Sequence, residues 1–179
     1  MTTPPARAIL TPMDERSAVL SESELVGWGE RIGREAGVPL VLALRGDLGA
    51  GKSTLARAVA RGAGVERPVP SPTFNLLFRY DTPRGIKIAH LDLYRLDRPE
   101  QVWALGWSDL PGLDELVMVE WPERASALLP SPRWEISIEE VDDPDARRVT
   151  VAAVGAPPEL PDIGARRAGG QALTDSDRE

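Results

Sequence analysis

The sequence predicts an α/β fold in which a mixed parallel and antiparallel sheet is flanked by helices. A short run of branched apolar residues at 38–45 leads through a glycine-rich turn into an amphipathic segment at 52–64. A second apolar run, Val117 to Val119, is typical of another buried strand. Two further pairs of segments are typical of strands joined by tight turns and therefore antiparallel: 71–80 with 86–94, and 133–140 with 147–154.

Length and composition limit the kinds of protein that this chain can be. Its 179 residues suggest one domain, and its 42% hydrophobic and 27% charged residues are ordinary for a globular protein. The chain has no cysteine, which excludes disulfides and thiolate metal sites. Neither a membrane-length apolar run nor a signal-peptide pattern is present, so the expected location is cytoplasmic, with no membrane contact. The net charge of −7 argues against direct binding to nucleic acid.

The chain is expected to divide into a domain with two extensions. Residues 1–17 mix proline with polar residues and are predicted to be loose, and the domain is assigned to 18–154. Its first helix is predicted within 21–37, where Ser21 and Glu24 form a capping box. One face of this helix is apolar: Leu25, Trp28, Ile32 and Ala36. A short helix is predicted at 98–107, and 155–179 is predicted to be a disordered tail because it lacks aromatics and is rich in proline and glycine.

The glycine-rich turn carries the first chemical motif. Residues 46–53 read GDLGAGKS and fit the phosphate-binding pattern G-x-x-x-x-G-K-[ST]. Strand, turn and helix follow in the order that a P-loop needs, so backbone N–H groups are expected to surround a nucleotide phosphate. Lys52, one of two lysines among 21 Lys and Arg residues, would reach the β- and γ-phosphates, and Ser53 would join a Mg²⁺ shell. The alternative is a glycine-rich turn with an incidental lysine, and the strand–turn–helix context disfavours it.

Two acidic residues lie where a P-loop protein needs them. Glu120 directly follows an apolar strand and is a candidate second anchor for Mg²⁺, although it could simply be the first exposed residue of a loop. In the segment HLDLYRL, alternation along a strand places His90, Asp92 and Tyr94 on one face. Asp92 could orient the attacking water or hold the metal shell, and Tyr94 and His90 could brace it. The alternative is a solvated strand face. His90 is not expected to bind a transition metal, because the chain has no second histidine.

Thr73 is a further candidate in the segment SPTFNL. Its hydroxyl lies between proline-restricted residues and a strand, where it could sense a γ-phosphate as switch segments do. The alternative is a residue that merely begins the strand.

Four motifs in order resemble the bacterial TsaE family: GDLGAGKST, SPTFNL, HLDLYRL and VEWPE, within about residues 20–154. TsaE is the small ATPase required to make threonylcarbamoyladenosine on tRNA. The resemblance implies a P-loop NTPase that binds ATP or ADP with Mg²⁺ and acts with the TsaB–TsaD complex, which modifies adenosine 37. Hydrolysis would reset that complex between turnovers. tRNA would then be contacted only through these partners, which suits an acidic chain.

The resemblance also implies roles for individual residues. The phosphates would be bound by Gly46, Asp47, Leu48, Gly49, Ala50, Gly51, Lys52, Ser53 and Thr54. Ser53 and Glu120 would hold Mg²⁺, and Asp92 with Lys52 would serve hydrolysis. Thr73 would belong to the switch-like segment. Ser21–Glu22 and Arg147 would lie near the nucleotide.

Two other functions are compatible with a P-loop. A small-molecule kinase would need an acceptor pocket and usually a lid with arginines, and too few residues lie between Glu120 and the last hairpin for an obvious lid. A nucleotide-gated adaptor would need nucleotide binding but not hydrolysis. For the adaptor, loss of Lys52 would abolish function, whereas loss of Asp92 would leave it intact.

Overall fold

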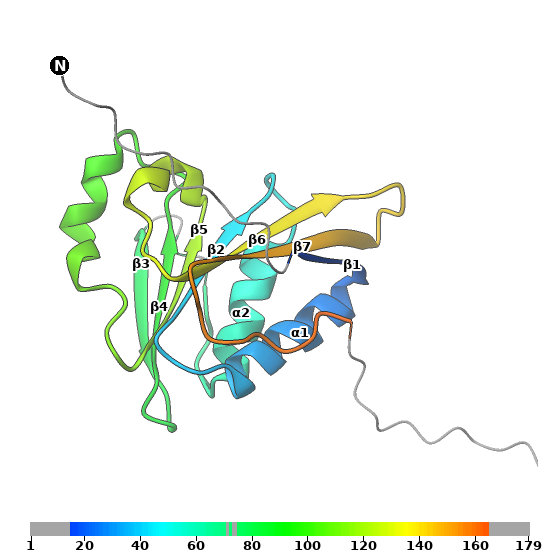
Figure 1. Cartoon of the computed structure of the whole chain (residues 1–179), viewed down its shortest axis with the longest axis horizontal. Coiled ribbons are helices and arrows are strands. Elements are labelled where there is room, and N and C mark those ends of the chain that lie inside the picture. Colours follow the sequence, from blue (N-terminus) through cyan, green and yellow to red (C-terminus); the bar gives the residue numbers. More distant parts are fainter. Residues whose placement is uncertain (1–14, 71, 73–74, 165–179) are drawn as a thin grey trace, which may run out of the picture.

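The computed structural model describes residues 15–70, 72 and 75–164. Seven strands form one sheet in the order β1-β7-β6-β2-β5-β4-β3. The strands are β1 (Arg16–Ser21), β2 (Leu40–Arg45), β3 (Leu77–Asp81), β4 (Lys87–Asp92), β5 (Glu115–Glu120), β6 (Arg133–Glu140) and β7 (Ala146–Val154). The α-helices are α1 (Glu22–Glu35) and α2 (Lys52–Gly62), and the 3₁₀ segments are η1 (Pro99–Leu105), η2 (Trp107–Asp109) and η3 (Pro122–Leu128). Figure 1 shows these elements in sequence colours.

The sheet is parallel in its centre and antiparallel at its edges, which confirms the predicted mixed sheet. β2 runs parallel to both β5 and β6, and β4 runs parallel to β5. The antiparallel pairs are β3 with β4, β6 with β7, and β1 with β7. Residues 40–44 of β2 are all buried, as expected for a central parallel strand that is covered on both faces. The P-loop therefore begins from one of the most enclosed strands of the sheet.

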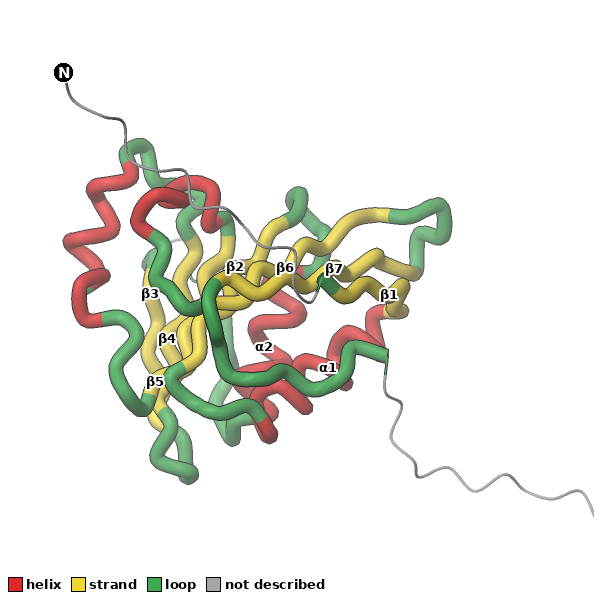
Figure 2. Tube along the Cα trace, in the orientation of Figure 1, coloured by secondary structure: helices red, strands yellow, loops and turns green. Residues whose placement is uncertain are grey.

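Different elements cover the two faces of the sheet (Figures 1 and 2). Helices α1 and α2 pack on one face, where Leu42, Met118 and Ile136 belong to the same buried cluster as Trp28 and Val59. The 3₁₀ segments cover the other face at β2, β5 and β4, in a second buried cluster that contains Val41, Leu91, Val117, Val102 and Trp107. Alternate residues of these strands therefore enter separate cores.

Helix α1 begins at the predicted capping box and packs very closely on α2. The Ser21 side chain accepts from the Glu24 N–H, and the Glu24 carboxylate accepts from the Ser21 N–H at 3.0 Å. A Cβ added at Gly33 would lie 2.0 Å from the Val59 carbonyl oxygen, and one at Gly62 would lie 2.1 Å from the Glu30 carbonyl oxygen. Glycine at these positions lets the two helix backbones approach each other directly.

The predicted N-terminal boundary is wrong at its last residues. Arg16 and Ser17 were expected within a loose extension of residues 1–17, but both belong to β1, which pairs with β7 at the edge of the sheet. Ser17 lies opposite Thr150. The extension prediction failed here because β1 is stabilised by a strand about 130 residues away in the sequence, and no local pattern announces this partner. Residues 1–14 lie outside the described part of the chain.

The predicted disordered tail is wrong for residues 155–164. This segment runs alongside α1 (orange in Figure 1), and Leu160 and Ile163 are each only 6% exposed. The Trp28 indole N–H donates to the Pro161 carbonyl at 3.0 Å, and the Trp134 indole donates to the Pro158 carbonyl at 2.8 Å. Composition predicted disorder, but these carbonyls satisfy two buried indoles that would otherwise lack acceptors. Residues 165–179 lie outside the described range.

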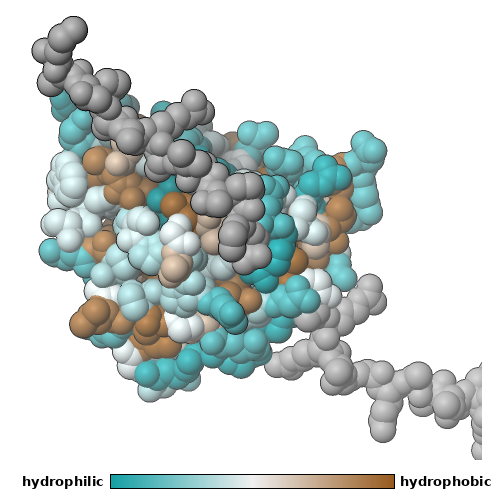
Figure 3. Space-filling view, in the orientation of Figure 1, coloured by the Kyte–Doolittle hydropathy of each residue, from teal (hydrophilic) through white to brown (hydrophobic). Residues whose placement is uncertain are grey.

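The remaining boundaries differ in detail from the prediction. The strand expected at 71–80 begins only at Leu77, and the strand expected at 86–94 ends at Asp92. The short helix expected at 98–107 is a 3₁₀ segment that starts at Pro99, followed by η2. Within the described residues, the helices are too short or too polar to span a bilayer. On the face drawn in Figure 3, apolar side chains form small separate groups among hydrophilic ones.

Candidate functional site

The P-loop joins β2 to α2 through backbone conformations that only glycine adopts easily. Gly46 has φ of 140°, and a Cβ there would lie 2.3 Å from the Ile138 carbonyl oxygen. Gly51 has φ of 114° and is the N-cap of α2, with no side chain to cap the helix. The first N–H groups of α2 therefore have no side-chain acceptor at this cap. A helix start of this kind, preceded by a tight glycine loop, suits a bound phosphate.

Lys52 lies at the base of this loop with its ammonium group enclosed. Its Nζ donates to the Gly46 carbonyl at 2.6 Å and to the Asp47 carbonyl at 2.8 Å, and it lies 3.9 Å from the centre of the Trp121 ring. Only 4% of the residue is exposed. Burial lowers the pKa of this ammonium below its ordinary value of 10.5, against the opposing effect of the carboxylates of Glu120, Glu123, Asp92 and Asp47. The structure thus places a partly dehydrated cation beside the P-loop backbone.

Glu120 connects the P-loop helix to β4. It is 2% exposed, and the Ser53 hydroxyl donates to its Oε2 at 2.7 Å while His90 Nε2 lies 2.8 Å from its Oε1. Because β5 runs parallel to β2, with Glu120 opposite Leu44, its carboxylate reaches the same sheet edge as the P-loop. A hydroxyl beside a carboxylate is the oxygen donor set that Mg²⁺ prefers when phosphates and water supply its other ligands.

The described residues contain no cluster of three or more His, Cys, Asp or Glu side chains able to hold a metal by themselves. Mg²⁺ that binds together with a nucleotide usually takes only one or two ligands from the protein. Ser53 and Glu120 therefore fit a metal that binds together with phosphate, not a preformed protein cage.

Asp92 is enclosed at the end of β4 and not on a solvated strand face. It is 3% exposed and lies opposite Glu120 in the β4–β5 pairing. Its Oδ1 accepts from the Tyr94 N–H at 2.9 Å, in the turn that follows β4. His90 on the same face is fully buried, whereas Tyr94 is 41% exposed and lies against Trp121, with ring centres 4.9 Å apart. The alternative of a solvated face therefore does not hold for Asp92 and His90.

These side chains border a pocket of about 280 Å³ at the P-loop. It is lined by Leu48, Gly49, Gly51, Lys52, Ser53, Thr54, Arg57, Asp92, Tyr94, Glu120 and Trp121. The structure thus brings the predicted pair of carboxylates into one pocket with Lys52 and Ser53. Leu48 lies at the tip of the loop and is 79% exposed. Sequence reasoning missed Arg57, although it lies one helical turn after Ser53 and helical side chains lean toward the N-terminus, which places it toward this pocket.

A second pocket of about 360 Å³ adjoins the first on the other side of the P-loop. It contains the predicted Glu22 and Arg147, which come from opposite ends of the sequence and meet because β7 pairs with β1 just before α1. The other lining residues are Ser21, Ser23, Leu25, Gly49, Ala50, Gly51, Thr54, Pro144 and Asp145. Glycines 49 and 51 border both pockets, so one extended ligand could occupy them together. Thr73 lies outside the described residues.

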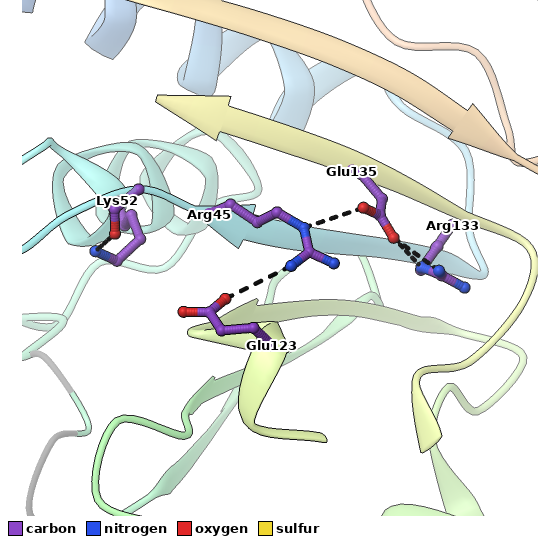
Figure 4. Close-up of polar contacts among 6 residues, drawn as sticks. Arg45, Lys52, Glu123, Arg133 and Glu135 are labelled. Carbon is purple, nitrogen blue, oxygen red and sulfur yellow. Dashed lines mark hydrogen bonds and ion pairs between the residues drawn. The ribbon is translucent and has the colours of Figure 1, made fainter. Parts of the chain in front are cut away.

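An ion-pair network holds the strand from which the P-loop begins (Figure 4). Arg45, the last residue of β2, lies 3.0 Å from Glu135 of β6 and 3.7 Å from Glu123 of η3. Arg133 also binds Glu135, at 2.7 Å. Burial raises the pKa of the Glu135 carboxyl, but its hydrogen bonds to Arg45 and Arg133 outweigh burial and hold that pKa below the ordinary value. The network thus ties the start of the P-loop to a neighbouring strand.

Comparison with known proteins gives a consistent set of relatives. The family model described as "Threonylcarbamoyl adenosine biosynthesis protein TsaE" matches residues 19–149. A "tRNA threonylcarbamoyladenosine biosynthesis protein TsaE" from Haemophilus influenzae is 38% identical over 114 residues, which cover 64% of this chain and 70% of the relative. The protein of the same name from Bacillus subtilis is 38% identical over 121 residues, covering 64% and 70%. The crystal structure of Bacillus subtilis YdiB superposes with a TM-score of 0.63 and 28% identity, over 79% of this chain and 87% of that one.

Proposed function

The chain belongs to the TsaE family, and from this premise we propose that it is the ATPase that supports threonylcarbamoyladenosine synthesis on tRNA. Membership implies a P-loop-type nucleotide-binding protein in this biosynthesis. The observation that carries the finer proposal is the grouping of Lys52, Ser53 and Glu120 at the P-loop, with Asp92 in the same pocket. A binding module would need the first group only, whereas a hydrolase also needs a residue that can orient water.

The P-loop would bind the phosphates of ATP. Backbone N–H groups at the start of α2 would donate to them, and the Lys52 ammonium would exchange its bonds to the Gly46 and Asp47 carbonyls for bonds to phosphate oxygens. Ser53 and Glu120 would hold Mg²⁺ between them. When bound, that ion neutralises charge on the phosphates.

Asp92 would act on the attacking water. Its carboxylate is enclosed and its Oδ1 is fixed by the Tyr94 N–H, so its direction is set before a substrate arrives. An oriented carboxylate can accept a hydrogen bond from water and hold it in line with the phosphorus. The ribose and base of ATP extend beyond its phosphates and would reach the adjoining pocket. There Glu22 and Arg147 would contact the ribose or the base.

The partner would be the TsaB–TsaD complex, and tRNA would be met only through it. A net charge of −7 disfavours direct phosphate-backbone binding but does not impede a protein–protein contact. Hydrolysis would convert an ATP-bound, partner-holding state into an ADP-bound state that releases the complex between turnovers.

The variant Asp92→Asn tests the proposal. It should keep ATP affinity nearly unchanged and slow hydrolysis by on the order of tenfold or more, because it removes a positioned catalytic group. Modified tRNA formed by the TsaB–TsaD complex should fall under multiple turnover and be less affected in a single turnover. Asp97→Asn, at an exposed carboxylate beyond β4, is the matched control. Slow hydrolysis with normal multiple turnover would favour the adaptor instead, and normal hydrolysis would remove Asp92 from the chemistry.

A further inference from the structure

We infer that His90 is a positioning residue that holds the Glu120 carboxylate toward Ser53. The inference rests on the proposed nucleotide and Mg²⁺ binding, and it assigns to the chain's one histidine a task in that site. His90 does not line the P-loop pocket and is fully buried, so it would act through Glu120 and not on the nucleotide.

The two ring nitrogens of His90 have different surroundings. His90 Nε2 lies 2.8 Å from Glu120 Oε1. A carboxylate can only accept, so Nε2 carries the hydrogen and donates it. Nδ1 is buried and has no hydrogen-bond partner among the described residues. An orphaned buried nitrogen is unfavourable, and an apolar side chain on β4 would avoid it. A purely structural role would therefore be served better by leucine or phenylalanine, as at the neighbouring buried positions Ile88 and Leu91.

Both carboxylate oxygens of Glu120 are directed by donors from different elements. Ser53 of α2 donates to Oε2 at 2.7 Å, and His90 of β4 binds Oε1. The terminal torsion of a glutamate is broad and roughly two-fold, so one donor leaves the carboxylate free to rotate, whereas two opposed donors select one plane. With that plane fixed, Oε2 stays beside the Ser53 hydroxyl, where phosphate-bound Mg²⁺ would be held. Partners of this kind around metal ligands typically change metal affinity by about 10- to 100-fold when they are removed.

Two amide variants separate positioning from packing. In His90→Gln, the amide nitrogen can take the place of Nε2 and still donate to Glu120. In His90→Asn, the shorter amide takes the place of Nδ1 and cannot reach the carboxylate. Calorimetric titration of the full chain with ADP, with and without MgCl₂, gives the factor by which Mg²⁺ tightens ADP binding. We expect this factor to fall by about tenfold or more in His90→Asn and to be largely retained in His90→Gln. The affinity for ADP alone should change little in either variant.

Coupling with Glu120→Gln tests whether His90 acts through Glu120. If it does, His90→Asn lowers the Mg²⁺ factor in the wild-type background but adds little when Glu120→Gln is already present. Thermal unfolding of each variant without nucleotide shows whether packing has changed. If His90→Asn lowers Tm but leaves the Mg²⁺ factor unchanged, the histidine is structural and the inference is wrong.

Other outcomes are equally decisive. Loss of the Mg²⁺ factor in a folded His90→Gln variant to the same extent as in His90→Asn would overturn the inference, because the donor is then irrelevant. If Asn at position 90 prevents folding, His90→Gln is compared with the wild type alone, and a folded Gln variant that has lost the Mg²⁺ factor overturns the inference. Full additivity with Glu120→Gln would also overturn it. Wild-type protein that binds no ADP would refute the proposed function itself, whereas normal wild-type binding with an unaltered His90→Asn factor refutes only the role of His90.

Discussion

Replacing Gly33 by alanine should push apart α1 and α2, the two helices that cover one face of the sheet. Gly33 lies on the side of α1 that contacts α2. A Cβ there would lie 2.0 Å from the Val59 carbonyl oxygen and 2.6 Å from the Ala63 nitrogen, and both are backbone atoms. The helices would have to move apart by about 1.4 Å to lengthen the first contact to an ordinary 3.4 Å. Rotation of a side chain cannot relieve such a clash.

Two opposing contributions set the size of the effect. Alanine is favoured over glycine within a helix by at most about 1 kcal/mol. Overpacking a tight interface costs about 1–3 kcal/mol, and a contact with backbone belongs at the upper end of that range. The steric cost therefore exceeds the helix gain, and the free energy of unfolding should fall by roughly 2 kcal/mol. For a domain of this size, that change corresponds to a fall in Tm of roughly 4–8 °C.

Gly27→Ala is the matched control, because it makes the same substitution in the same helix. A Cβ at Gly27 would have no atom within 4 Å, so only the helix preference acts and this variant should be unchanged or more stable by up to about 1 kcal/mol. Urea denaturation followed by circular dichroism gives both free energies. A Gly33→Ala protein as stable as the wild type would refute the close-packing argument. A destabilised Gly27→Ala protein would show that α1 does not tolerate alanine for another reason.

Three further outcomes are expected. Lys52→Ala should abolish ADP binding in calorimetry yet unfold cooperatively, and retained tight binding would remove Lys52 from the site. Leu160→Ala should lower the free energy of unfolding by about 2 kcal/mol or more, and a loss below about 0.5 kcal/mol would mean that residues 155–164 contribute little to stability. The pKa of the Glu135 carboxyl is lowered in the folded state, so the wild type should be more stable than Glu135→Gln at neutral pH. This difference in the free energy of unfolding should vanish as the pH falls below 4.5, the ordinary pKa of the carboxyl. A difference that does not change with pH would contradict the ion pairs.

Local patterns were sufficient for the elements whose partners lie close in sequence. The capping box at Ser21 and the strand–turn–helix around Lys52 depend on neighbouring residues only, and both were predicted from the sequence. Strand β1 could not be predicted, because its alternation over six residues becomes meaningful only when β7 is known to lie beside it. Residues 155–164 were wrongly predicted to be disordered. Composition shows how much apolar surface a segment has, but it does not show whether backbone carbonyls of the segment accept hydrogen bonds from buried indoles.

The site followed the same division. Glu120 could be placed near the P-loop because it ends an apolar strand beside the P-loop strand, whereas Asp92 was selected from the alternation of polar and apolar residues along its own strand. The bond from His90 to Glu120 could not be predicted, because it depends on the register of β4 against β5 and on side-chain rotamers. Arg57 was missed because the P-loop pattern stops at position 53 and assigns no role to the next helical turn.

The environments of the tryptophans make the chain a set of separate optical reporters. The sequence has five tryptophans, all within the described residues, and of these Trp121 alone lines the P-loop pocket, with the Lys52 ammonium over its ring. Trp28 and Trp134 instead donate to carbonyls of residues 155–164. Emission that changes when a nucleotide displaces the ammonium should therefore come from Trp121. Emission that shifts when residues 155–164 detach should come from Trp28 and Trp134, so ligand binding and local unfolding act on different tryptophans.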